Sequence, residues 1–81
     1  MDAMDKIIAT QTQITMLHAQ IYELMKIQQK NIEEESKEFP PMLALAVMYR
    51  METDHQNKAI EYNQHCLEKY KEMKKNKSPE E

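Results

Sequence analysis

Glycine is absent from this chain of 81 residues, which also has no tryptophan, three prolines and five aromatic residues. Folds with many tight turns or short strands need residues that tolerate a positive φ angle, so the absence of glycine favours long helices joined by few turns. It also excludes the glycine-rich loops that bind phosphate groups. The single cysteine, Cys66, excludes a disulfide within one chain.

The charge balance limits the classes of partner. The formal net charge is −3 and the isoelectric point is near 5.6, whereas nucleic-acid binding needs a concentrated basic face. No run approaches the roughly 20 apolar residues that a membrane-spanning helix needs, and the first residues lack the basic and apolar segments of a signal peptide. We therefore expect a cytoplasmic protein that binds neither nucleic acid nor membranes.

Apolar residues recur at helical spacing in the first third of the chain. Ile7, Ile14 and Ile21 are seven residues apart, and Leu17 and Leu24 each follow an isoleucine by three residues. Packing between helices selects β-branched residues at one seam position and leucine at the other. We predict a helix over residues 3–35, whose seam (Ile7, Ile14, Leu17, Ile21 and Leu24) packs either within a hairpin or between copies of the chain.

A proline pair separates this helix from a second one. The residue before a proline avoids the α region, so Phe39-Pro40-Pro41 predicts a turn over residues 36–40. A second helix is expected over residues 41–75, followed by a frayed charged tail over 76–81. Thr53 begins a stretch with capping-box spacing that would suit a third helix. Without glycine or proline nearby, we expect one continuous helix.

The predicted fold is all-α, with two long helices in an antiparallel helical hairpin that forms one domain over residues 1–81. Two helices can shield only one stripe of each other, so we expect the hairpin to form a homo-oligomer, a dimer or a larger helical bundle. An antiparallel hairpin places acidic residues of the first turn near lysines of the last turns, where both signs suit the helix dipoles. These residues are Asp2 and Asp5, and Lys69, Lys71, Lys74 and Lys75.

The second helix opens with ten residues, 42–51, that are apolar on nearly every side, so one antiparallel partner cannot cover them. The chain holds eight methionines, whose side chains adapt to varied surfaces. We predict that Leu45, Met48, Tyr49 and Met51 bind an amphipathic helix of a partner protein. The alternative is that the same residues fill the core of an oligomer.

One spacing points to a metal. Glu52 and His55 are three residues apart and share a helix face, and hairpin folding would bring Glu23 towards them. This Glu-x-x-His spacing resembles the two-helix, encapsulin-associated ferritin-like proteins, over about residues 20–67. The resemblance implies an iron site of Glu23, Glu52 and His55, completed by dimerisation, with ferroxidase activity. The alternative is a solvated polar belt across the middle of the helix.

The remaining pattern argues against a side-chain nucleophile. His65 and Cys66 are adjacent, so on a helix they point about 100° apart and cannot form a nucleophile–base pair. We expect a small acidic helical protein-interaction module without a cofactor: an adaptor, chaperone or regulator. Its size, charge and two-helix plan are similar to those of the small co-chaperones of type III secretion. The alternatives are the iron protein, a phage-type inhibitor of a host protein, or a structural coiled-coil subunit.

Overall fold

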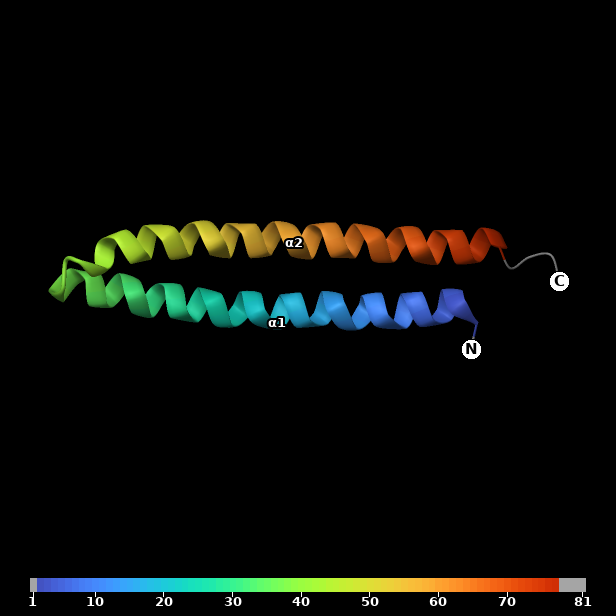
Figure 1. The fold of residues 1–81 in the computed structure, drawn as a ribbon, viewed down its shortest axis with the longest axis horizontal. Helices are drawn as coiled ribbons and strands as arrows, with labels where there is room; N and C mark the ends of the chain where they lie inside the picture. Colours follow the sequence, from blue (N-terminus) through green and yellow to red (C-terminus); the bar gives the residue numbers. More distant parts are fainter. Residues whose placement is uncertain (1, 78–81) are drawn as a thin grey trace.

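The computed structural model describes residues 2–77, which form two α-helices of 36 residues each. Helix α1 spans Ala3–Glu38 and helix α2 spans Met42–Lys77. They lie side by side and antiparallel in a hairpin of 66 × 17 × 12 Å, with the connection at one end (Figure 1). The all-α helical hairpin predicted from the sequence is confirmed.

The two ends of α1 are closed by local hydrogen bonds. The Asp2 carboxylate accepts a hydrogen bond from the Asp5 backbone N–H at 2.9 Å, which is the expected N-terminal cap. The C-terminal end lies at Glu38, three residues beyond the predicted end. There the Ser36 hydroxyl donates to the Glu33 carbonyl at 2.7 Å, and the Phe39 N–H donates to the Glu35 carbonyl at 2.8 Å. These bonds hold the last turn although its glutamates lie at the negative end of the dipole.

The connection is three residues long, Phe39 to Pro41. Phe39 leaves the helical region with φ −129° and ψ 87°, and Pro40 cannot donate the hydrogen bond that would continue α1. Helix α2 starts with a bond from the Met42 N–H to the Phe39 carbonyl at 2.9 Å. It runs through Thr53, whose hydroxyl donates to the Tyr49 carbonyl at 2.9 Å, so the expectation of one continuous helix is confirmed. Of the predicted tail, residues 76 and 77 are helical and 78–81 lie outside the described residues.

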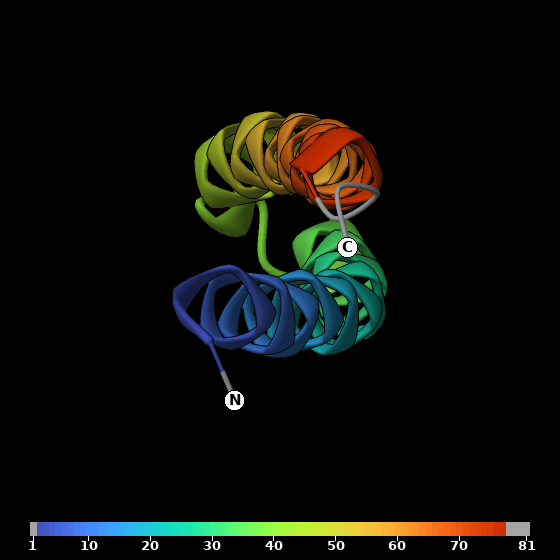
Figure 2. The same cartoon turned by 90° about the vertical axis from the view of Figure 1, so that its right-hand side faces the viewer.

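A heptad pattern on each helix selects the residues that lie between α1 and α2. Buried or half-buried positions recur alternately three and four residues apart, the spacing of a left-handed coiled coil. Seen from one end, the two helices are inclined to each other (Figure 2). We call these two sets the inward stripes: Met4, Ile8, Gln11, Thr15, His18, Tyr22, Met25, Gln29, Ile32 and Ser36 of α1, and Met42, Ala46, Tyr49, Thr53, Gln56, Ile60, Asn63, Leu67, Tyr70 and Lys74 of α2.

Polar pairs occupy the middle of the inward stripes. The Gln11 amide Nε2 donates to Asn63 Oδ1 at 2.7 Å, and the Gln56 amide Nε2 donates to the His18 carbonyl at 3.3 Å. Within residues 2–77 only Ala46 and Thr53 are buried, with 3% and 5% of their surface exposed. More than half of the inward residues are apolar or aromatic, but polar pairs lie among them and few residues are fully buried.

The isoleucine and leucine seam lies elsewhere. Its five residues, from Ile7 to Leu24, are between 37% and 66% exposed. Each precedes an inward residue by one position, which rotates it by about 100° away from α2. The interpretation of these residues as the seam within the hairpin is therefore corrected, because their C-terminal neighbours fill that contact. The interpretation as a seam between copies stays a prediction.

We predict that the polar pair Gln11–Asn63 costs stability in exchange for register. Replacing both residues (Gln11→Leu with Asn63→Leu) should raise the free energy of unfolding in urea by about 1 kcal/mol, because facing leucines suit a coiled-coil interior. Asn63→Leu alone should gain less, since it removes the acceptor of the Gln11 amide. A double variant less stable than Asn63→Leu would contradict this.

Candidate helix-docking face

An apolar face runs along one side of the hairpin. In an antiparallel helix pair, the residue that precedes an inward residue points to the same side of the pair in both helices. Large apolar residues with high exposure recur at these positions in α1 and α2. The apolar face consists of Ile7, Ile14, Leu17, Ile21 and Leu24 of α1, and Leu45, Met48, Tyr62 and Met73 of α2.

Two shallow hollows show that both helices contribute to this side. Ile7 and Ile14 of α1 line a hollow of about 330 Å³ together with Tyr70 of α2. Nearer the turn, a groove of about 320 Å³ is lined by Ile32, Leu45, Met48, Tyr49 and Glu52. The hollow on the opposite side of the hairpin has charged walls, with Lys26, Arg50 and Asp54 among its lining residues.

The residues predicted to bind a partner fall into two places. Leu45, Met48 and Tyr49 line the groove near the turn, where Leu45 and Met48 are 50% and 60% exposed. Met51 is 56% exposed but does not line this groove, because it lies midway between inward residues and points away from α1. Ile32 completes the groove from α1, which the apolar run of residues 42–51 could not reveal by itself.

The three candidate metal ligands do not meet within one chain. Glu52 Oε2 lies 3.8 Å from His55 Nδ1, and both side chains are about two-thirds exposed. Glu23 instead pairs with Lys26 at 3.6 Å. Over residues 2–77, no three His, Cys, Asp or Glu side chains gather in a way that could hold a metal ion. An iron site completed by a second chain stays a prediction.

Polar residues interrupt the apolar face at several levels. They are Thr10, Gln28 and Asn31 on α1, and Glu52, His55 and Lys69 on α2.

On the apolar face of α2, Tyr62 lies one helical turn from the half-buried Cys66. A hydrogen bond with the Cys66 side chain is the largest cause that raises the pKa of Tyr62 above its ordinary value. The Tyr62 hydroxyl therefore stays neutral near pH 7, and this part of the face carries no tyrosinate charge.

Ion pairs join the helices near both ends. At the open end Lys74 Nζ contacts Asp5 Oδ1, as the antiparallel arrangement predicts, and this hydrogen bond raises the pKa of Lys74. Near the turn Arg50 donates to Glu33 Oε2 at 3.0 Å. The pKa of Glu33 is lowered, first by the hydrogen bond from Arg50 and then by that from Gln29.

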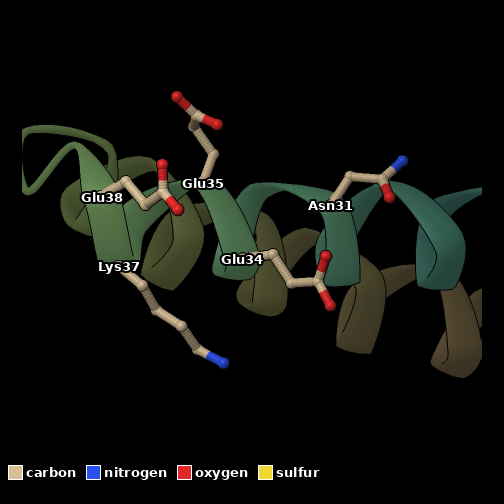
Figure 3. A pocket seen from close by; sticks show the side chains of 5 residues that line it. All are labelled: Asn31, Glu34, Glu35, Lys37 and Glu38. Atoms are coloured by element: carbon tan, nitrogen blue, oxygen red, sulfur yellow. The ribbon is translucent and has the colours of Figure 1, made fainter.

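Acidic side chains gather at the end of α1 without forming a site. Asn31, Glu34, Glu35, Lys37 and Glu38 line a hollow of about 400 Å³. Their side chains point in different directions and do not converge on a common point (Figure 3). This cluster makes the turn end of the hairpin acidic but offers no set of ligands.

Comparisons with known proteins give no relative. The chain matches no family model, and no curated protein or solved structure matches it. Over the described residues, neither helix has an apolar stretch long enough to cross a lipid bilayer. The apolar face and the groove within it are therefore the features from which function is inferred.

We predict that acid weakens the contact between Glu33 and Arg50. Because the folded-state pKa of Glu33 is lowered, its charge stabilises the hairpin above the unfolded-state pKa, and this contribution is lost as pH falls through the folded value. Glu33→Gln should therefore lower the melting temperature slightly at pH 7 and leave it unchanged at pH 2. Circular dichroism melts check this. The control is Glu34→Gln, because Glu34 makes no ion pair among the described residues. An equal effect of both variants at pH 7 would contradict the prediction.

Proposed function

We propose that this protein is a small cytoplasmic protein-interaction module, an adaptor, chaperone or regulator, whose apolar face binds amphipathic helices of another chain. The observation that carries this proposal is the exposure of nine large apolar side chains along one side of a two-helix hairpin. Exposed clusters of large apolar side chains mark interaction sites in soluble proteins. Two adjacent helices with a shallow furrow between them suit a third helix laid along them.

The groove near the turn is one of the two hollows on this face. Ile32, Leu45, Met48 and Tyr49 surround it with aliphatic, thioether and aromatic groups from both helices. Methionine and tyrosine adapt to partners of different shape, so this groove suits an apolar anchor residue of the bound helix. Glu52 at its edge would favour a basic residue beside that anchor.

Two matched substitutions test the groove. Met48→Asp and Met51→Asp place the same charge on similarly exposed methionines of one helix, but only Met48 lines the groove. We expect Met48→Asp to weaken the binding of a fluorescent 18-residue Leu/Lys amphipathic peptide about tenfold or more, because a hydrated carboxylate would replace an apolar contact with the leucine face of the peptide. Met51→Asp should bind like the unmodified chain.

Fluorescence anisotropy, with the protein titrated upwards from nanomolar concentration, measures both affinities. Circular dichroism is used to check that both variants remain helical. Equal affinities for the two variants would refute the groove as the binding site and remove the main support for the proposed function.

A further inference from the structure

We propose that the apolar face is covered by a second copy of this chain, in a two-fold dimer that places the turn of each hairpin at the open end of its partner. This proposal rests on the proposed function, since it names the amphipathic helices that the face binds. Its support comes from surface area, from the pattern of apolar positions and from the distribution of charge.

The chain exposes more surface than a compact monomeric protein of the same mass. The hairpin exposes 6309 Å², whereas a compact monomeric protein of 9.7 kDa exposes about 5,100 Å². The excess of about 1,200 Å² exceeds the roughly 800 Å² that each partner contributes to an ordinary stable interface. A second hairpin that covered about 800 Å² of the apolar face would remove about two thirds of this excess.

The apolar positions of each helix are those of a four-helix bundle. In α1 the inward Ile8, Tyr22 and Met25 each follow a residue of the apolar face, and in α2 Ala46 and Tyr49 do the same. The apolar residues thus fall both at the inward heptad positions and at the positions just before them, so the apolar band is wider than the inward stripe alone, although polar residues interrupt it. Its centre lies between the neighbouring helix and the open face. A two-fold dimer would cover the apolar band on both hairpins, because the apolar face of each hairpin would pack against the apolar face of the other.

The charge distribution selects the orientation of the second copy. Residues 30–41 at the turn end contain four glutamates and two lysines. Residues 2–9 and 68–77 at the open end contain six lysines and four acidic residues. Two copies with their turns together would place like charges at each end of the bundle. Two copies with turns at opposite ends bring the acidic end of each against the basic end of the other, and this is favoured.

The first test compares two neighbouring residues of equal exposure. Leu17 lies on the apolar face and Met16 outside it, and each is 53% exposed. Sedimentation equilibrium should give a mass of twice 9.7 kDa for the unmodified chain. The chain is measured at about 10–100 μM. Leu17→Asp should weaken association on the order of 100-fold, and Met16→Asp should leave it unchanged.

The mass of the unmodified chain decides the proposal even where Leu17→Asp fails to fold. A helical monomer at the highest concentration would overturn the second copy as the occupant of the face. Loss of peptide binding in Met48→Asp would then still support the proposed function. A trimer or larger species would also overturn the dimer.

The second test measures orientation with one spin label per chain, in a Cys66→Ser background whose dimeric mass is checked first. Glu72→Cys places the label on the outer side of α2, roughly 12 residues past its midpoint. With turns at opposite ends, two labels are offset along the bundle by about 36 Å, from 1.5 Å per residue. With turns together, the offset vanishes and only the width of the bundle, below about 30 Å, separates them. Pulsed electron paramagnetic resonance distances above about 35 Å are expected, and a distribution below 30 Å would overturn the proposed orientation.

Discussion

On each helix the inward stripe and the apolar face are rotated from each other by about 100°. This rotation decides which side chains lie between the helices and which remain exposed. The stripe that faces the neighbouring helix carries amides, threonines and a histidine in its middle, whereas the isoleucines and leucines point to solvent one position earlier. A buried or half-buried polar pair contributes only about 1 kcal/mol net, but it fixes which residues lie opposite each other. The pair Gln11–Asn63 joins α1 to α2 at one defined position, while the exposed isoleucines and leucines remain available for other contacts.

Much of the fold could be predicted because it depends on local rules. The Asp2 cap, the break at Pro40 and the continuity of α2 through Thr53 each follow from residues close together in sequence. The end of α1 was predicted too early because the unfavourable effect of glutamates at a helix C-terminus, about 0.3–1 kcal/mol, is smaller than the effect of a proline that cannot continue the helix. Only Pro40 ends α1.

The contact between the helices could not be predicted in the same way. A heptad of isoleucine and leucine indicates that a helix packs against another helix, but not whether the partner belongs to the same chain. The pairing of Gln11 with Asn63 joins positions 52 residues apart and has no signal in either local pattern. The candidate site also depends on contacts between the two helices that local sequence patterns do not show. Residues 42–51 indicated an apolar surface, but Ile32 of α1 decides that Leu45 and Met48 line the groove and that Met51 does not.

Association at the apolar face would be coupled to folding of the hairpin. With two buried residues in the described chain, the apolar burial inside one hairpin is small, while ordering its backbone costs about 1–2 kcal/mol per residue. Any chain that covers the apolar face adds burial only to the folded state, and so stabilises it in proportion to the logarithm of its concentration. The polar pairs of the inward stripes and the apolar face thus differ in what they can do: the first join the two helices at defined positions, and the second would make the stability of the hairpin depend on any chain that covered it.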